Sequence, residues 1–232
     1  GAGVAGGAAA SALADRDMRV LLVERSDWPR GKVCGGCISA AGRSVFHTLG
    51  LDQALRRSGG TAFEHLHLAA AGRAVRLAVP TGLAVARDRL DAELAAAAVE
   101  RGATFLHGTT ATVGDCAATH RTVNLRRGRE SWTVRAKLVL AATGLSGSVG
   151  GAMDALPGGV RAGARMGLGV VLDHEPAGYD RGVIHMACDR AGYVGVTSVG
   201  GGRCDVAAAV DLDAVRGAAS PGRLAAAILD RA

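Results

Sequence analysis

The chain has 232 residues, 49% of them hydrophobic, which is enough to bury the core of one large domain or two smaller ones and argues against disorder. Glycine is abundant at 35 residues and aromatic residues amount to only 3%, so the core must consist of Ala, Val and Leu, which suits an α/β protein. The formal net charge of +6 comes from scattered Arg residues, which argues against nucleic acid as a partner because that interface needs a clustered basic face.

The first predicted elements form a Rossmann-type βαβ unit without its first strand. Residues 4–16 are Ala-rich and predict a helix. Residues 18–24 form a continuous apolar run, which is typical of a parallel strand buried on both faces. Asp17 lies in the turn between them, where it must adopt the left-handed conformation that Gly would adopt more easily.

A dinucleotide fingerprint, Gly-x-Gly-x-x-Gly, stands at the start of this helix. Its first Gly makes a tight turn, its second lets a pyrophosphate approach, and its third packs helix on strand, while the helix N-terminus offers N–H groups to a diphosphate. The residues expected at the cofactor here are Gly1, Gly3, Val4, Ala5 and Gly6. Glu24 ends the strand about twenty residues on, where an acid can bind a ribose hydroxyl, so the unit predicts adenine-dinucleotide binding.

The later elements are predicted from alternation, apolar runs and Gly breaks. In chain order we expect a hairpin over 63–79 turning at 70–73, a helix over 88–101 ended by Gly102, a strand over 103–106, a hairpin over 123–134 turning at 127–129, and a buried strand over 137–142. Residues 160–210 predict an antiparallel sheet, and 221–232 predict a helix. Residues 114–118 contain Gly-Asp but are interpreted as a simple loop.

The segment after Glu24 is the most specific part of the sequence. Residues 24–36 read Glu-Arg, then a basic loop, then Cys-Gly-Gly. This succession resembles the geranylgeranyl reductase-like family of FAD-dependent oxidoreductases, within the fold shared with aromatic-ring hydroxylases. The resemblance implies that Arg25 lies near the adenosine ribose and that Cys34, Gly35 and Gly36 pass close to the flavin. A Gly pair suits this role because it lets backbone approach a flat ring.

Three further segments are similar to the same family. Residues 87–90 match its Arg-x-x-Leu segment, which implies that Arg87 reaches the bound FAD. Residues 108–111 resemble the stretch whose backbone holds the adenine, with Ala111 in the usual Val position. Residues 141–144 correspond to a strand end that closes over the cofactor at Gly144, although Thr143 replaces the more usual Asp.

The expected fold class is α/β, with a Rossmann-like FAD-binding domain on a parallel sheet and a mainly antiparallel β-sheet substrate domain. We expect 1–58 and 86–150 to form the FAD-binding domain, 59–85 and 151–215 the substrate-domain sheet, and 216–232 the start of a helical segment. The chain begins without Met and lacks the family's later Gly-Asp flavin motif, so we expect a piece truncated at both ends that binds FAD weakly if at all.

Two departures from related enzymes bear on the substrate. Prenyl reductases of the group carry Tyr-x-Trp-x-Phe-Pro, of which only Tyr193 remains, so a long prenyl chain is not supported. Trp28 and Trp132 do not form the Trp-x-Trp motif of flavin halogenases, so halogenation is not supported either.

Several polar clusters have simpler interpretations than a reactive site. Cys34 and Cys37 have the spacing of a redox or zinc pair, but no second pair completes a metal set, so no metal is expected. His65 and His67 are expected on the polar face of an edge strand, and residues 173–175 in a solvated turn. No catalytic side chain can be named from the sequence.

The predicted function is a two-electron reduction or oxidation of a small organic substrate, lipid-like or polyketide-like, by an FAD-dependent enzyme with NAD(P)H or another donor. A flavin monooxygenase and a non-catalytic adenine-dinucleotide-binding fragment remain alternatives, whereas Cys34-Gly-Gly argues against a plain NAD-dependent dehydrogenase. Five irregularly spaced cysteines favour a reducing cytoplasm, and no stretch predicts a transmembrane helix. Peripheral membrane contact and oligomeric state stay open.

Overall fold

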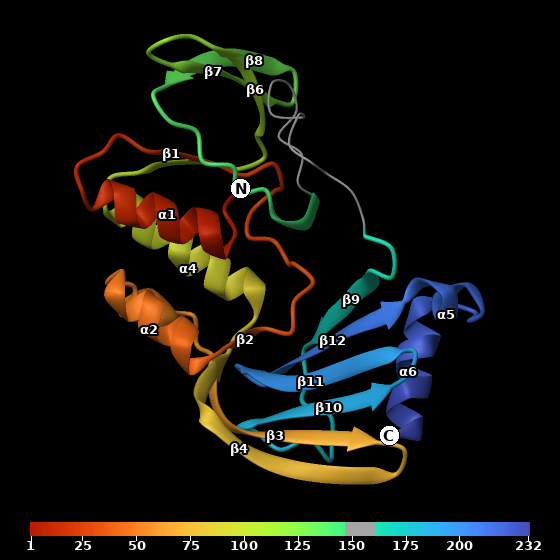
Figure 1. The fold of residues 1–232 in the computed structure, drawn as a ribbon. Helices are drawn as coiled ribbons and strands as arrows, with labels where there is room; N and C mark the ends of the chain where they lie inside the picture. Colours follow the sequence, from red (N-terminus) through yellow and green to blue (C-terminus); the bar gives the residue numbers. More distant parts are fainter. Residues whose placement is uncertain (147–160) are drawn as a thin grey trace. The chain divides into compact units, whose positions relative to one another are not determined.

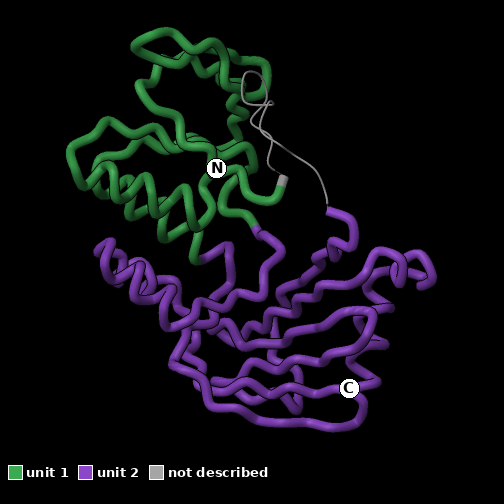
Figure 2. The backbone as a smooth tube through the Cα atoms, in the orientation of Figure 1, with its two compact units in different colours: residues 1–30, 90–159 green, residues 31–89, 160–232 purple. Residues whose placement is uncertain are grey.

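The computed structural model describes residues 1–146 and 161–232. The chain divides into two compact units (Figure 2). The first consists of Gly1–Arg30 and Leu90–Gly159, and the second of Gly31–Arg89 and Val160–Ala232. The boundaries of these units differ from the domain boundaries expected from the sequence. The expected domain boundaries remain a prediction.

The first unit combines a parallel strand pair, two packed helices and a three-stranded antiparallel sheet (Figure 1). Its elements are α1 (Val4–Ala14), β1 (Leu21–Val23), most of α4 (Arg87–Glu100), β5 (Thr104–Leu106), β6 (Thr110–Cys116), β7 (Arg121–Arg127), β8 (Glu130–Ala136) and the 3-10 turn η1 (Gly144–Ser146). Strands β1 and β5 run parallel with Leu22 opposite Phe105, and β6, β7 and β8 pair in chain order.

The core of the first unit is built from small side chains, as the composition predicts. A Cβ added to Gly7 on α1 would lie 2.9 Å from the Leu94 Cβ on α4, so the two helices approach closely. Such an approach needs small residues at the contact, and alanines fill the rest of it. The buried cluster comprises Ala2, Ala10, Ala14, Leu22, Ala95, Ala98 and Ala103.

The second unit is a seven-stranded sheet in the order β2-β4-β3-β10-β11-β12-β9, with four helices. Its elements are β2 (Cys37–Ile38), α2 (Ala40–Thr48), α3 (Asp52–Arg57), β3 (Thr61–Ala70), β4 (Arg73–Ala84), β9 (Arg165–Leu172), β10 (Val183–Asp189), β11 (Gly192–Gly200), β12 (Arg203–Asp211), α5 (Leu212–Arg216) and α6 (Pro221–Arg231). Only β3 and β10 pair in parallel, and every other pair is antiparallel. The predicted α/β class, with one parallel and one mainly antiparallel sheet, is confirmed.

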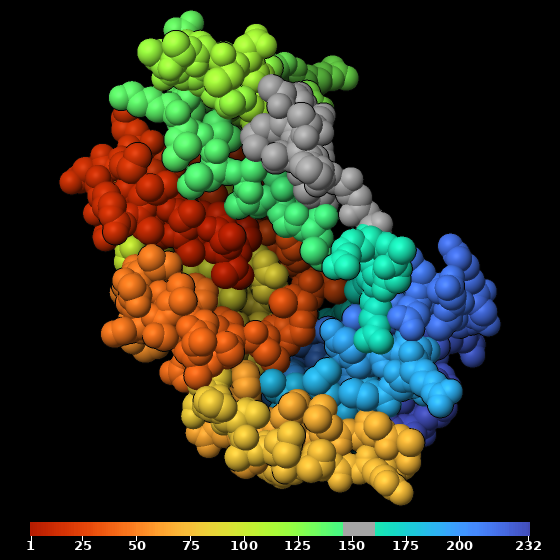
Figure 3. Space-filling model, viewed as in Figure 1, coloured from red at the N-terminus to blue at the C-terminus, as the bar shows by residue number. Residues whose placement is uncertain are grey.

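Helix α6 covers part of this sheet, and the β3–β4 hairpin lies at its outer side. Helix α6 packs Leu224, Ala225 and Ile228 against a cluster that includes Val194 and Val210. The β3–β4 hairpin (yellow to orange) forms an outer surface of the unit (Figure 3), and its residues 75 and 77 expose apolar side chains there.

The turns follow the residue types that predict them. Asp17 has a φ of 57°, in the left-handed region expected for the residue that follows the first helix. The β3–β4 turn contains Ala71 and Gly72 with φ of 51° and 70°, and Gly102 has a φ of 97° after α4. These predictions are confirmed.

Three predictions from the sequence are wrong. Residues 137–142 form no strand, and Leu138 and Leu140 are exposed at 64% and 54%, because a buried strand needs a neighbouring strand and none in the described residues pairs with them. Residues 114–116 belong to strand β6 instead of a loop, since a bulge lets the pairing continue to Cys116. His65 and His67 lie on β3, which is an interior strand between β4 and β10.

Candidate functional site

The turn that leads into α1 is packed so tightly that it accepts only Gly at two positions. A Cβ on Gly6 would lie 1.8 Å from the Gly1 carbonyl oxygen, and a Cβ on Gly1 would lie 2.6 Å from the Ala142 carbonyl oxygen. Gly3 is the N-cap of α1 and provides no side chain to cap it. The helix therefore begins with backbone N–H groups that no capping side chain covers, as a phosphate-binding turn requires.

Glu24 is buried directly behind this turn. Its exposed fraction is 5%, and its carboxylate accepts hydrogen bonds from the backbone N–H groups of Ala2, at 2.9 Å, and Ser26, at 3.1 Å. Its own backbone N–H donates to Leu106 and its carbonyl accepts from Thr109. Glu24 is therefore fixed beside the Gly-rich turn, where the fingerprint predicts the ribose-binding acid.

The charge of Glu24 is held by its surroundings. Burial alone would raise the pKa of this carboxyl, but the N–H groups of Ser26 and Ala2 and the Arg30 guanidinium together hold the pKa below its ordinary value. Arg30 approaches Glu24 at 3.4 Å and donates to Asp91 at 2.7 Å, and the Asp91 side chain is fully buried. A negatively charged Glu24 is what acceptance of a ribose hydroxyl requires.

The Arg30 side chain also lies over an aromatic ring. Its guanidinium lies 5.4 Å from the centre of the Trp28 ring, and Trp28 packs edge-on against Phe105 at 5.1 Å. Sequence reasoning assigned no role to Arg30 or Asp91, which lie 61 residues apart in the chain. The basic loop of the 24–36 segment was a signal for Arg30, but nothing in the sequence pointed to its pairing with Asp91.

The other residues predicted at the cofactor in this unit are less constrained. Arg25 is exposed, next to Glu24. Ala111 lies on β6 opposite Leu125. Gly144 begins η1 with a φ of 71°, two residues after Ala142, which packs against the Gly-rich turn. The structure thus brings Gly1, Gly6, Glu24 and the segment before Gly144 together.

The residues predicted near the flavin, Cys34, Gly35 and Gly36, belong to the second unit, in a loop that leads into Cys37 on β2. Gly36 has a φ of 65°, and its carbonyl accepts a 2.8 Å hydrogen bond from the Val85 N–H. A Cβ on Gly36 would lie 2.8 Å from the Val85 carbonyl oxygen, so only Gly fits there. Gly35 is exposed, with open space where a Cβ would lie. The loop therefore presents bare backbone at Gly35 over a tightly held Gly36.

Arg87 begins helix α4, whose first turn is tied to the sheet of the second unit. Arg203 on β12 makes two hydrogen bonds to Asp88, at 2.9 and 3.1 Å, and lowers the pKa of that carboxyl below its ordinary value. This bidentate pair fixes the helix start that carries Arg87. The Arg-x-x-Leu match thus lies on a rigid element.

A protein-family match covers most of the chain. Residues 1–188 match the protein family described as lycopene cyclase protein. The chain belongs to the lycopene cyclase protein family. No curated protein matches this family member in sequence.

Solved structures show which fold this lycopene cyclase family member shares. A flavoprotein/dehydrogenase from Cytophaga hutchinsonii is similar in structure, with 16% sequence identity and a TM-score of 0.79. The match covers 100% of this chain and 60% of the Cytophaga protein. A geranylgeranyl bacteriochlorophyll reductase-like protein from Thermoplasma acidophilum matches 100% of this chain over 59% of its own length, with 21% identity and a TM-score of 0.79. Aklavinone-11 hydroxylase, solved with FAD and aklavinone, matches 92% over 45% of its own length, with 19% identity and a TM-score of 0.69.

These matches confirm the resemblance to geranylgeranyl reductase-like flavoproteins at the level of the fold. The chain spans between 45% and 60% of the length of the three solved proteins. The roles predicted for individual cofactor residues are not tested by these matches and stay predictions.

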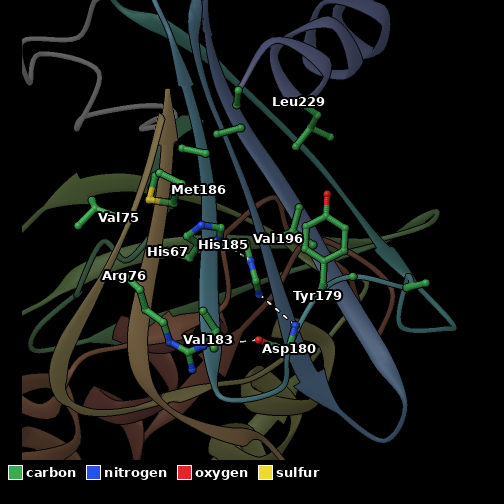
Figure 4. Close-up of a pocket in the computed structure, with 16 residues that line it drawn as sticks. His67, Val75, Arg76, Tyr179, Asp180, Val183, His185, Met186, Val196 and Leu229 are labelled. Atoms are coloured by element: carbon green, nitrogen blue, oxygen red, sulfur yellow. Dashed lines mark hydrogen bonds and ion pairs between the residues drawn. The ribbon is translucent and has the colours of Figure 1, made fainter. Parts of the chain in front are cut away.

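The sheet of this family member also carries an open pocket of about 690 Å³ (Figure 4). Two histidines from neighbouring strands meet in it, His67 Nδ1 lying 3.3 Å from His185 Nδ1, and Tyr179 packs edge-on against His185 at 5.1 Å. The Asp180 N–H donates to His185 Nε2 at 3.1 Å, and Arg76 pairs with the Asp180 carboxylate at 3.6 Å. The histidines form a polar pair inside the sheet, not an edge-strand face.

This pair predicts an acid-sensitive second unit. Burial, followed by the neighbouring His67, lowers the pKa of His185 below 6.5, so the folded protein favours the neutral ring. The resulting stability is present above pH 6.5 and is lost as pH falls below it. His185→Gln should therefore flatten the fall in unfolding temperature on acidification, measured by circular dichroism.

The control is His47→Gln, because His47 is 79% exposed and pairs with Asp52 on the surface. It should leave the acid dependence of the wild type unchanged. Equal slopes for wild type and His185→Gln would refute the prediction.

Other polar groups fall into structural roles. Glu175 of the predicted solvated turn accepts hydrogen bonds from Ser198 and Arg181, so this turn is tied to the sheet. In residues 1–146 and 161–232, no group of three or more His, Cys, Asp or Glu side chains could hold a metal ion. Within the same residues, no helix is long and apolar enough to cross a membrane.

Proposed function

We propose that this chain is the cofactor-binding and substrate-domain part of an FAD-dependent oxidoreductase. The observation that carries the proposal is the Gly1–Gly6 turn backed by the buried, charged Glu24. A turn with Gly at positions 1, 3 and 6 and an uncapped helix N-terminus fit a diphosphate, and a buried carboxylate fits a ribose hydroxyl. These residues suit the ADP part of FAD.

The flavin part of the cofactor is proposed to lie at Cys34, Gly35 and Gly36. The resemblance of residues 24–36 and the bare backbone at Gly35 support a place for Cys34, Gly35 and Gly36 near the ring, with Arg87 as a further contact to FAD. Bound there, FAD would supply two-electron chemistry, while this chain binds, orients and shields. Arg25, Ala111 and Gly144 are proposed contacts to the adenosine side.

The proposed reaction is the reduction or oxidation of a small organic substrate, with NAD(P)H or another donor. A geranylgeranyl bacteriochlorophyll reductase-like protein and a hydroxylase of aklavinone share the fold, which supports a lipid-like or polyketide-like substrate. We propose the cytoplasm as its compartment, since the five cysteines are free in the described structure.

Binding of FAD by the purified chain tests the proposal. Glu24→Gln should weaken FAD binding about ten- to a hundredfold, because the ribose hydroxyl loses a charged acceptor. The dissociation constant is measured by quenching of flavin fluorescence, with circular dichroism to verify folding. Glu130→Gln, an exposed change on β8 of the same unit, is the matched control and should bind as the wild type.

The result that contradicts the proposal is equally direct. A wild-type chain that binds NAD but takes up no FAD would leave only a dinucleotide-binding unit. Where FAD binds, loss of its visible absorption on addition of NAD(P)H without oxygen identifies the electron donor.

Two observations favour second candidates. The fold is shared with aklavinone-11 hydroxylase, which supports a monooxygenase; incorporation of oxygen from O₂ into the product separates it from a reductase. The family name supports a polyene such as lycopene as substrate; conversion of lycopene into a cyclic isomer, without net NAD(P)H consumption, would identify that activity.

A further inference from the structure

Asp205 is a largely buried acidic residue of the second unit. It lies on strand β12 with an exposed fraction of 4%. Among the residues that the structure describes, no hydrogen bond or ion pair involves its side chain. A buried carboxylate without a partner is costly, and burial accordingly raises the pKa of Asp205 to about 6. A fold that needed only a polar residue there would be more stable with Asn.

The Asp205 carboxyl lies against the Cys34–Cys37 loop. A Cβ on Gly36 would lie 3.2 Å from Asp205 Oδ2 and 3.3 Å from the Val199 Cγ1, so the missing side chain of Gly36 makes room for the carboxyl. On the neighbouring strand, Thr197 lies opposite Asp205 in the register. The Cys37 thiol donates to the Gly35 carbonyl oxygen at 3.1 Å, and Thr197 lowers the pKa of this thiol. Loop, thiol, hydroxyl and carboxyl therefore form one cluster within the second unit.

Within the described residues, burial is the cause that raises the pKa of Asp205, and no charged neighbour contributes to the shift; Arg203, two residues earlier on β12, pairs with Asp88 instead. From the loop and β2 come Cys34 and Cys37. Cys37 is exposed as a whole residue, but desolvation of its sulfur raises the pKa of the thiol to about 11, and Asp205 and Cys34 raise it further, so this thiol stays neutral. From β12 comes Cys204, whose pKa is raised by burial. Glu175, from the segment before β10, acts on Cys204. Asp205 is thus the group of this cluster that changes charge near neutral pH.

We propose that Asp205 is the acid–base residue of the site at the Cys34–Cys37 loop, and that it exchanges a proton with the ligand bound there. This role rests on the proposed FAD-dependent function. In the forward direction the O–H bond of the Asp205 carboxyl breaks, the proton passes to a basic atom of the bound substrate, and water restores the proton afterwards. No electrons move in this step.

Two features support this role over a purely structural one. An acid–base group works best when both of its protonation states are populated at the operating pH, and burial without a partner produces that condition. The carboxyl is also next to the loop that the resemblance places at the flavin, instead of deep in the α6-covered core.

The test follows Asp205 directly in the full chain. Carbon-13 NMR of the aspartate carboxyls, with and without FAD, should find one resonance that titrates with a midpoint of about 6 and is absent in Asp205→Asn. FAD should move this midpoint by about half a pH unit or more, because a ligand at the loop changes the solvation of the carboxyl. Asp211→Asn, an exposed change on the same strand, is the control and should leave the resonance in place.

Stability gives a second readout. The raised pKa of Asp205 destabilises the folded state as pH rises from 3.8 through about 6, so Asp205→Asn should unfold at a higher temperature than wild type above pH 6. The two proteins should unfold alike below pH 3.8.

Each failure has its own meaning. A midpoint near 3.8 overturns the proton role while leaving FAD binding intact. A midpoint near 6 that FAD does not move overturns the link to the loop site. A wild-type chain that binds NAD but takes up no FAD overturns the proposed function, and the role of Asp205 with it.

Discussion

Arg30→Met should lower the free energy of unfolding of the first unit by about 3–5 kcal/mol. Arg30 is the cation between Glu24 and Asp91, whose side chains are exposed by only 7% and 0%. Removing the guanidinium leaves two buried carboxylates near each other without that cation. Such a loss costs far more than a surface pair, because neither carboxylate can turn to water.

The measurement is chemical denaturation at neutral pH. Arg216→Met is the control, since its pair with Asp213 is exposed on both sides, at 78% and 91%, and should cost less than about 1 kcal/mol. Arg30→Lys should lie between wild type and Arg30→Met, because an ammonium cannot reach both carboxylates with a planar fork. Equal stabilities of Arg30→Met and Arg216→Met would show that the buried pair contributes nothing.

Arg30→Met should also change how the free energy of unfolding depends on pH in acid. The lowered pKa of Glu24 contributes stability that is present above its unfolded value of 4.5 and is lost as pH falls through the folded value. Arg30 is one cause of that lowering. In Arg30→Met this acid dependence should therefore become shallower.

Local signals in the sequence predicted much of the fold. The Gly-rich start of α1, the left-handed Asp17 and the turn at Ala71 and Gly72 all depend on residues a few positions apart. Backbone conformation at such positions is set by the residue itself, so a single sequence contains the information. The apolar run at 137–142 failed because a strand also depends on its neighbours, which a local pattern does not contain.

The residues of the candidate site also fall into those that local sequence predicts and those that depend on packing. Glu24 could be placed because its distance from the Gly-rich turn along the chain is fixed by the βαβ unit. The partners that hold its charge could not, since Asp91 meets Arg30 only through the packing of α4 in the first unit. Asp205 was missed for a related reason. A single Asp in an apolar strand is noticeable only once the structure shows that it is buried beside Gly36.

Gly6→Ala should destabilise the first unit by more than about 4 kcal/mol and abolish FAD binding. The added Cβ would lie 1.8 Å from the Gly1 carbonyl oxygen and 3.3 Å from the Ala142 Cβ. A clash with backbone cannot be relieved by a side-chain rotation, so α1 must move away from the Gly-rich turn that precedes it. The N–H groups of the helix start would then lose their position relative to Glu24.

A series of three helix glycines isolates this effect from helix propensity, because each Gly→Ala change in a helix interior gains about 1 kcal/mol intrinsically. In Gly222→Ala on α6 the Cβ meets nothing nearer than the Ser220 hydroxyl at 4.0 Å, so this variant should become more stable. In Gly7→Ala the Cβ meets the Leu94 Cβ at 2.9 Å, so α1 and α4 must separate slightly and the gain should be cancelled. Chemical denaturation and FAD titration of the three variants should place Gly6→Ala far below the others; if it matches Gly7→Ala, the Gly-rich turn is not held against the helix as described.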